Sequence, residues 1–502
     1  MNWNQTKGDK AMLRRHFLIS AVVLVLGALI GCINLGPQYQ RPDVNIEIPK
    51  FYESDSIRSS VDAMIADRWW HDFNDPELNR LVQDVLLYNW DLKQAAARIL
   101  ESRAQYVQIS ADRWPQVNFD YDWDQRRFGG VNVGRGETIT THQVSFPALF
   151  EIDLWSRLAK ASRAAWNQIL VDEENRRTIA QTLVAETINL YLQIEALERR
   201  LQIAAESIAA FERSLQFVET RYRRGLTSAL DVRQARRILA GAQTRVPELQ
   251  QQLGITQQQL SILLGRYPEI RPPRAQPADY YRQPGPVPTG LPSTLLRQRP
   301  DIRAAEMRLQ ALNDQIGAAK ADRFPKITLT GSYGWNADGK DRLFKSDSVV
   351  WNFARGVVQP LVDADRLKAR QRGVEAQYQQ AVSDYANTVL NAFAEVEGAL
   401  LTRQKQLERR QREVIFLEEA RATQRVAQNR YIKGLIQYLD VLDAQQTRFT
   451  AEDNLAQVDL NILTNRVNLH RALGGSWAVP QPIKLQRDGY FFDFETEDTE
   501  LP

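Results

Sequence analysis

Side chains that commonly perform catalysis or bind metals are few in this sequence of 502 residues. It contains four histidines and one cysteine, Cys32. His71, His142 and His470 stand alone, without a second imidazole or thiol at a metal-ligand spacing, so each is expected to be a surface or packing residue. There is no phosphate-binding loop, and the many acidic side chains fall in helical patterns whose charged faces are solvated. The sequence therefore predicts a protein that is not an enzyme and holds no metal or cofactor.

Cys32 is the residue with the clearest chemistry. It follows Leu29-Ile30-Gly31, at the end of 15 uncharged residues (17–31) that come directly after the basic pair Arg14-Arg15 and a histidine. That stretch is long enough for the core of a signal peptide and short for a membrane-spanning helix. The pattern resembles a bacterial lipobox, which implies acylation of the Cys32 thiol and anchoring in lipid. Ile33 in place of aspartate favours sorting to the outer membrane. The alternative is a signal anchor with an incidental cysteine.

The basic surplus of the chain lies in this leader. Residues 1–31 carry four basic residues against Asp9, a balance of +3 that equals the formal net charge of the whole chain. The remaining chain is neutral, which excludes the basic patch that a nucleic-acid partner requires. A mean hydropathy of -0.43 excludes a protein with many spanning helices.

The sequence contains two copies of one unit, offset by about 210 residues. Residues 91–115 and 301–325 share 8 of 25 positions, and residues 221–235 and 430–444 share 8 of 15. Each copy predicts a first helix (about 76–113 and 293–323), two strands, a very long helix and a returning helix after a glycine turn. Because no proline interrupts it, the long helix of the second copy is expected over about 366–432.

These features set the expected domain boundaries. The chain divides into a cleaved signal peptide (1–31), a lipidated N-terminal segment (32–75), a first repeat (76–267), a Pro-rich linker (268–292), a second repeat (293–477) and an acidic tail (478–502).

The expected strands alternate between apolar and polar residues. Residues 117–123 place Val, Phe, Tyr and Trp against Asn and Asp, and residues 327–335 place Ile, Leu, Gly, Tyr and Trp against Thr, Ser and Gly. Such alternation is typical of a transmembrane barrel wall, and also of an ordinary half-buried sheet. Four strands cannot enclose a channel, and open edges are not tolerated in lipid. The chain must therefore oligomerise if the strands span a membrane.

Several ordered motifs resemble one family. They are Gly36-Pro37-Gln38-Tyr39-Gln40-Arg41-Pro42, Trp69-Trp70-His71-Asp72-Phe73, Asn89-Trp90-Asp91-Leu92, Glu151-Ile152-Asp153-Leu154-Trp155, Arg299-Pro300-Asp301-Ile302-Arg303 and Tyr438-Leu439-Asp440-Val441-Leu442-Asp443. The chain resembles TolC-like outer-membrane efflux proteins, specifically the NodT-type lipoproteins of RND-type multidrug efflux. This implies an α+β membrane protein and a homotrimer. Four strands per protomer would form a 12-stranded transmembrane β-barrel, continued by a periplasmic α-helical coiled-coil barrel.

The resemblance also implies a passive exit duct with partners. Such ducts dock on a periplasmic adaptor (membrane fusion) protein that is coupled to an inner-membrane RND transporter. Two alternatives remain open: the exit duct of a type I secretion system, and a periplasmic coiled-coil scaffold lipoprotein that does not conduct.

The resemblance assigns a gate to four residues near the helical turns. Asp440 and Asp443 match acidic rings at a pore constriction, and Asp231 and Tyr431 match positions that link neighbouring coils in the closed state. The chain departs from the prototype at Ile436, where the prototype has an arginine. The alternative for the two acids of the last helix is local, because carboxylates in a first turn complement the helix dipole.

The turn residues themselves match the tip that an adaptor contacts. These residues are Arg221, Tyr222, Gly225, Leu226, Gly434 and Leu435. The alternative is that the motif only forms the turns, which the glycines would achieve by themselves.

Overall fold

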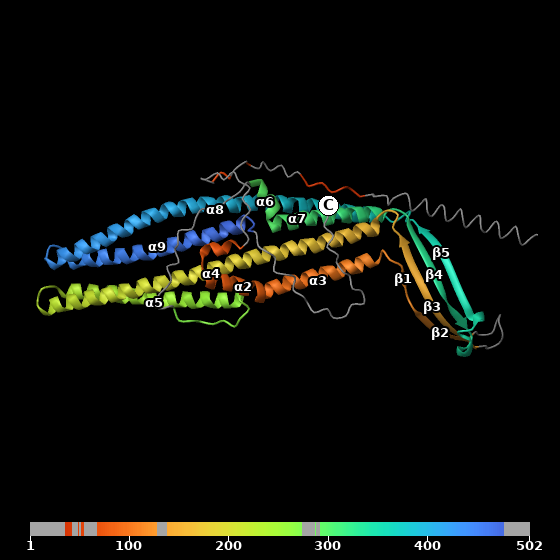
Figure 1. Ribbon diagram of the computed structural model, residues 1–502, viewed down its shortest axis with the longest axis horizontal. Coiled ribbons are helices and arrows are strands. Elements are labelled where there is room, and N and C mark those ends of the chain that lie inside the picture. Colours follow the sequence, from red (N-terminus) through yellow and green to blue (C-terminus); the bar gives the residue numbers. More distant parts are fainter. Residues whose placement is uncertain are drawn as a thin grey trace, which may run out of the picture. The chain divides into compact units, whose positions relative to one another are not determined.

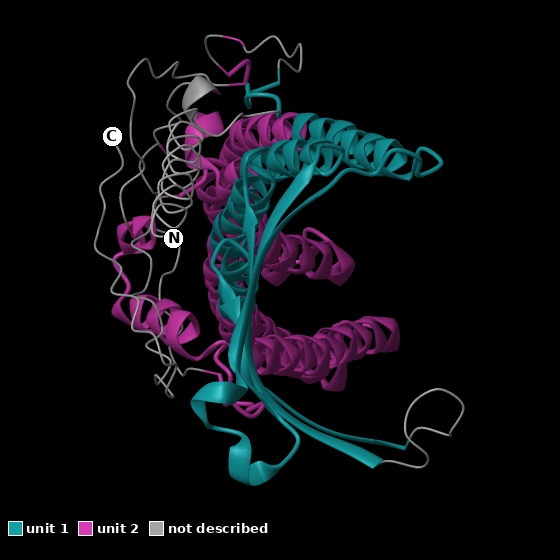
Figure 2. Ribbon diagram, turned by 90° about the vertical axis from the view of Figure 1, so that its right-hand side faces the viewer, with its two compact units in different colours: residues 1–45, 98–173, 304–387 teal, residues 46–97, 174–303, 388–502 magenta. Residues whose placement is uncertain are grey.

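The computed structural model of the protein describes residues 36–42, 49, 52–54, 68–127, 138–273, 287 and 292–475. Cys32 and its leader, most of the Pro-rich linker and the acidic tail lie outside these residues. Within the described ranges, no helix is both long enough and apolar enough to cross a membrane. The chain divides into two compact units (Figure 2). Unit 1 comprises residues 1–45, 98–173 and 304–387, and unit 2 comprises residues 46–97, 174–303 and 388–502.

Helices make up most of the described chain (Figure 1). The helices are η1 (Trp69–Phe73), α2 (Pro76–Tyr88), α3 (Trp90–Ala111), α4 (Arg157–Arg223), α5 (Ala229–Leu263), α6 (Pro292–Gln298), α7 (Pro300–Ala321), η2 (Lys340–Arg342), η3 (Ser346–Ser348), α8 (Arg366–Ile432) and α9 (Tyr438–Ala472). The strands are β1 (Gln116–Val117), β2 (Asp120–Arg127), β3 (Thr138–Ile152), β4 (Lys326–Ala337) and β5 (Val349–Val358).

The helices of the two halves have matching lengths in the same order. α3 and α7 have 22 residues each, α4 and α8 have 67 each, and α5 and α9 have 35 each. The expected helix over 366–432 is confirmed by α8. Along α8, Ala381, Tyr385, Val389 and Val396 are buried, and their spacing of four and seven residues places them on one face of the helix.

The first helix of each copy is broken, which corrects the prediction of one continuous helix. Asn89 has an extended backbone between α2 and α3, and its Oδ1 accepts hydrogen bonds from the N–H groups of Asp91 and Leu92 at 2.8 and 3.2 Å. This side chain caps a new helix. In the second copy α6 ends at Gln298 and α7 begins at Pro300, whose ring cannot donate the hydrogen bond of a helix interior but suits a first turn.

The five strands form one antiparallel sheet in unit 1. β1 and β2 both pair with β3, β3 pairs with β4, and β4 pairs with β5. The predicted first strand is thus interrupted. At the gap the Asn118 N–H donates to the Pro147 carbonyl at 3.0 Å, so β1 and β2 together line one edge of β3.

The register separates the two faces of this sheet. One row crosses all of its width through Tyr121, Val144, Trp335 and Val349. The neighbouring row is polar and holds Asp122, Gln143 and Asn336. Since side chains alternate between faces, one face is apolar and the other polar, and the sheet is visibly curved (Figure 2).

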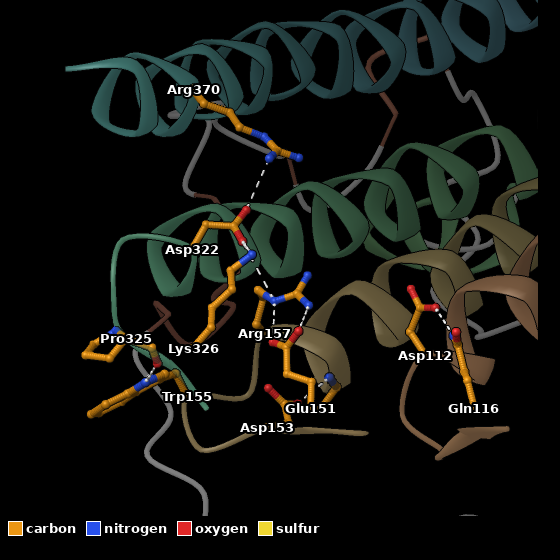
Figure 3. A network of polar contacts seen from close by, with 11 residues as sticks. Asp112, Gln116, Glu151, Asp153, Trp155, Arg157, Asp322, Pro325, Lys326 and Arg370 are labelled. Atoms are coloured by element: carbon orange, nitrogen blue, oxygen red, sulfur yellow. Dashed lines mark hydrogen bonds and ion pairs between the residues drawn. The ribbon is translucent and has the colours of Figure 1, made fainter. Parts of the chain in front are cut away.

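Ion pairs join the strands to the helices that continue them, all within unit 1 (Figure 3). Arg157 at the start of α4 donates two hydrogen bonds to Glu151 of β3, at 3.0 and 2.8 Å. Asp322 after α7 contacts Lys326 of β4 at 3.3 Å and Arg370 of α8 at 3.2 Å. These basic residues therefore all have carboxylate partners where the strands begin or end.

Unit 2 buries a histidine beneath an aromatic ring. The imidazole of His470 in α9 stacks on the Trp69 indole of η1, with ring centroids 4.5 Å apart and planes at 7°. The side chain is 2% exposed, and neither ring nitrogen has a hydrogen-bond partner among the described residues. Burial, aided by the nearby charge of Arg466, lowers the pKa of His470 to about 3. The packing role expected for this histidine agrees with its position.

Replacing His470 should alter how stability depends on pH. The folded protein keeps this imidazole neutral down to about pH 3, whereas the unfolded chain protonates it below about pH 6.5. Acid therefore favours the unfolded state, by about 2 kcal/mol at pH 5. His470→Phe, which retains a ring against Trp69, should lose that part of the pH dependence.

The measurement is the unfolding free energy at pH 7 and pH 5, followed by circular dichroism. His71→Phe, at an exposed histidine of η1, is the control and should keep the wild-type difference between the two pH values. An unchanged difference in His470→Phe would contradict the assignment.

Candidate functional site at the helical turns

The turn between α4 and α5 has the geometry of a Schellman motif. The Leu226 N–H donates to the Arg221 carbonyl at 2.9 Å, and the Gly225 N–H donates to the Tyr222 carbonyl at 2.9 Å. The turn after α8 repeats both hydrogen bonds. Gly225 and Gly434 have φ of +75° and +73°, a left-handed conformation that favours glycine. Turn geometry thus accounts for both glycines.

Carboxylates cap the helices that leave the turns. Asp231 accepts hydrogen bonds from the Ser228 N–H at 3.1 Å, the Ser228 hydroxyl at 3.0 Å and the Thr227 hydroxyl. Burial raises the pKa of Asp231, but these hydrogen bonds outweigh it and the pKa lies below the usual value. Asp440 accepts from the Gln437 N–H at 3.2 Å. Both acids therefore close capping boxes.

An apolar cluster in unit 2 joins the two turns. It contains Val218, Val232, Ala235, Ala427, Tyr431, Tyr438, Val441, Leu442 and Ala444. The rings of Tyr431 and Tyr438 lie 5.3 Å apart, and the Arg221 guanidinium lies over the Tyr431 ring at 5.2 Å. α4, α5, α8 and α9 thus meet at this cluster.

Asp231 and Tyr431, the two residues that match coil-linking positions, form no hydrogen bond with each other among the described residues. The Tyr431 hydroxyl is buried without a hydrogen-bond partner among the described residues, and the Asp231 carboxylate bonds to Thr227 and Ser228. Ile436 packs against the apolar cluster, so the position that holds an arginine in the prototype here contributes to packing. The cation that lies over the Tyr431 ring is the Arg221 guanidinium.

The two acids of the last helix differ in their local contacts. Asp440 and Asp443 are both exposed, Asp440 in the first turn of α9 and Asp443 in the turn that follows. Asp440 is engaged in capping, whereas the Asp443 carboxylate has no ion pair or hydrogen bond within the described ranges. Residues three apart lie on one face of a helix, so both charges are presented together to solvent.

Exposed apolar side chains surround the turns. Leu226 is 59% exposed and Leu435 is 62% exposed, and Tyr222 is also exposed. Leu230 and Leu439 are exposed as well, although neither was named as a candidate. They occupy equivalent positions of the repeated Leu-Asp-Val motif. The repeat in the sequence could therefore have indicated that they belong with Leu226 and Leu435.

A cavity of about 350 Å³ adjoins the apolar cluster that contains Tyr431 and Tyr438, within unit 2. Its lining comes from α4, α8 and α9 and includes Ser214, Phe217, Gln424, Tyr431, Gln445 and Arg448. The Oε1 of Gln445, like the Tyr431 hydroxyl, is buried with no hydrogen-bond partner in the described part of the chain. Because a buried polar atom without a hydrogen-bond partner is energetically unfavourable, such atoms favour binding of a polar side chain from a partner. Sequence patterns did not predict this cavity, because it forms between helices distant in sequence.

No metal centre accompanies the site in the described residues. Histidine, cysteine, aspartate and glutamate do not come together there in groups of three or more that could hold an ion.

Comparison with known families identifies the chain. The family described as "Outer membrane efflux protein" matches residues 81–266 and again residues 291–475. The chain therefore belongs to the outer membrane efflux protein family, whose members are channels rather than enzymes, and it is an outer-membrane protein. The expected family and localisation are confirmed.

Individual relatives and solved structures agree with this assignment. The chain is 31% identical over 457 residues to the probable outer membrane lipoprotein SilC of Salmonella typhimurium, covering 89% of this chain and 96% of the relative. It is 32% identical to the pyoverdine export outer membrane protein OpmQ of Pseudomonas putida, covering 94% and 100%. The outer-membrane channel OprN superposes with a TM-score of 0.83 at 29% identity, covering 88% and 99%. CusC superposes with a TM-score of 0.81 at 30% identity, covering 88% and 100%.

Two glycine-to-alanine substitutions should show whether backbone conformation, rather than lack of space for a side chain, requires glycine at the turn. A Cβ added at Gly434 meets nothing within 4 Å. Gly434→Ala should therefore lower the free energy of unfolding only by the cost of a left-handed backbone for alanine, about 1–2 kcal/mol. Gly398 in α8 also has open space but lies in a helix, so Gly398→Ala should stabilise by about 0.5–1 kcal/mol. Unfolding free energies of the two variants measure this, and shifts of the same sign would refute the backbone explanation.

Proposed function

We propose that the protein is the exit duct of a tripartite efflux pump, formed by three copies of this chain. Membership of the outer membrane efflux family supports the duct. The observation that carries the trimer is the sheet, which has one apolar and one polar face and, among the described residues, leaves β5 and the β1–β2 edge unpaired. With β1 and β2 counted as one interrupted strand, three copies joined edge to edge would give twelve strands, with lipid outside and water inside.

The two halves of the chain are proposed to be copies of one unit. Equal helix lengths and two separate family matches support this. Paired 67-residue helices from three chains would form the wall of a periplasmic α-helical barrel that continues the β-barrel.

The lipid anchor is proposed at Cys32. The lipobox pattern supports it, and SilC, at 31% identity, is itself described as a probable outer membrane lipoprotein. Lipidation would hold the N-terminus at the membrane that the sheet spans.

The turns are proposed to meet the periplasmic adaptor. Leu226 and Leu435 are exposed apolar residues of the turns, and a cavity with unsatisfied polar groups lies among α4, α8 and α9. This combination suits a protein partner. The adaptor would couple the duct to an RND-type transporter of the inner membrane. In this scheme Asp440 and Asp443 form the acidic constriction, and Asp231 and Tyr431 act through the packing of the turn.

The proposed duct can be tested on purified protein. Native mass spectrometry should show a trimer, and planar bilayers containing it should show discrete conductance steps. A monomer without conductance would overturn the duct.

The effect of the Asp440 and Asp443 charges at the proposed constriction can be measured separately from the effect of Asp440 as a helix cap. Asparagine keeps an oxygen that can accept the Gln437 N–H but lacks charge, so Asp440→Asn with Asp443→Asn should lower cation selectivity and weaken block by divalent ions while preserving the fold. Reversal potentials in asymmetric salt measure this. Glu408→Gln removes a carboxylate of α8 that pairs with Lys405 and is the control, expected to behave as wild type. Unchanged selectivity in the double variant would limit Asp440 and Asp443 to local roles.

A further inference from the structure

Arg355 lies on the apolar face of the sheet. The register pairs it with Leu329 of β4, and the alternation of β5 places Phe353 and Val357 on the same face. Both of these neighbours are 68% exposed. An arginine in an apolar exposed row is costly unless its charge finds a partner.

Among the residues that the structure describes, this charge has no partner. Among the described residues the Arg355 side chain forms no hydrogen bond or ion pair. The other basic residues of the junction differ, because Arg157 is bound by Glu151 and Lys326 by Asp322 (Figure 3). Lys326 also lies on the opposite, polar face, since its position alternates with that of Ile327.

A neighbouring copy would not supply a carboxylate on this face. β5 is an edge strand, and the other edge of the sheet is formed by β1 and β2. The acids of that edge, Asp120, Asp122 and Asp124, alternate with Tyr121 and Trp123. They therefore share the polar face and point away from the side on which Arg355 lies.

The level of Arg355 along the strand fits a membrane interface. It lies three residues before the last residue of β5, about 10 Å from the end that leads into α8. Arginine has a long flexible stem, so the guanidinium can extend toward the interface while its methylenes stay among apolar side chains. A cation at such a depth is tolerated far better than at the midplane.

We propose that Arg355 binds the phosphate of a phospholipid headgroup in the leaflet around the helix end of the sheet. The proposal rests on the proposed function, because it requires the apolar face to contact lipid. A guanidinium donates two parallel hydrogen bonds to phosphate oxygens, and Phe353 and Val357 offer an apolar surface to the acyl chains.

Native mass spectrometry of the full-length trimer, titrated with phosphatidylglycerol, tests this. Wild type should bind the lipid at least about tenfold more tightly than Arg355→Leu, since a charge-assisted hydrogen bond contributes about 1.5–3 kcal/mol. Arg355→Lys should fall between them, because an ammonium lacks the planar fork. Lys326→Leu is the matched control, from the polar face of the same sheet, and should bind as wild type.

Two further arms identify the ligand. Diacylglycerol, which lacks the phosphate, should bind wild type and Arg355→Leu equally, and excess inorganic phosphate should not displace phosphatidylglycerol. Equal binding of phosphatidylglycerol by wild type and Arg355→Leu, or displacement by inorganic phosphate, would overturn the site.

Conductance of the same preparations separates this proposal from the duct. Arg355→Leu should conduct as wild type does. If wild type and Arg355→Leu bind phosphatidylglycerol equally while wild type conducts normally, only the lipid site is refuted. If wild type does not conduct, the duct is refuted.

Discussion

The unpaired edges of the sheet are the constraint on which the rest of the structure depends. Among the described residues, β5 and the β1–β2 edge each leave a row of backbone N–H and C=O groups without partners. Lipid offers such groups nothing to bond with, so in the proposed duct these edges would close on the strands of other copies. The open edges also explain why a chain with few apolar helices can belong to a membrane channel family.

The two halves reach similar architecture through different side chains. Asn89 Nδ2 donates to the Leu263 carbonyl at 3.0 Å, and in the second half Arg299 Nη1 donates to the Ala472 carbonyl at 2.9 Å. Both bonds satisfy a carbonyl near the end of the returning helix, which has no partner within that helix. Arg299 also binds Glu395 at 2.8 Å, so the second half adds an ion pair to the same junction.

At the turns, acidic residues proposed for the gate also cap their own helices. Asp231 and Asp440 occupy equivalent positions and both close a capping box, which gives each a structural reason to be acidic. Asp443 has no such local contact within the described chain. Its charge is therefore the one that helix capping does not explain. Arg221 stacks on Tyr431, while Ile436 packs against the apolar cluster.

The sequence by itself determined the helices, the alternating strands, the turn glycines and the family. The helices, strands and turns follow from local periodicity and backbone preference, as the prediction of α8 over 366–432 illustrates, whereas the family follows from the resemblance of several ordered motifs. The helix break at Asn89 was missed because one capping side chain overrode a continuous apolar pattern. Only the tertiary structure showed that a cavity lies beside Gln445, and that Arg355 faces apolar neighbours without a counter-ion among the described residues. Each depends on contacts between segments or on sheet register, and the periodicity of a single segment does not encode them.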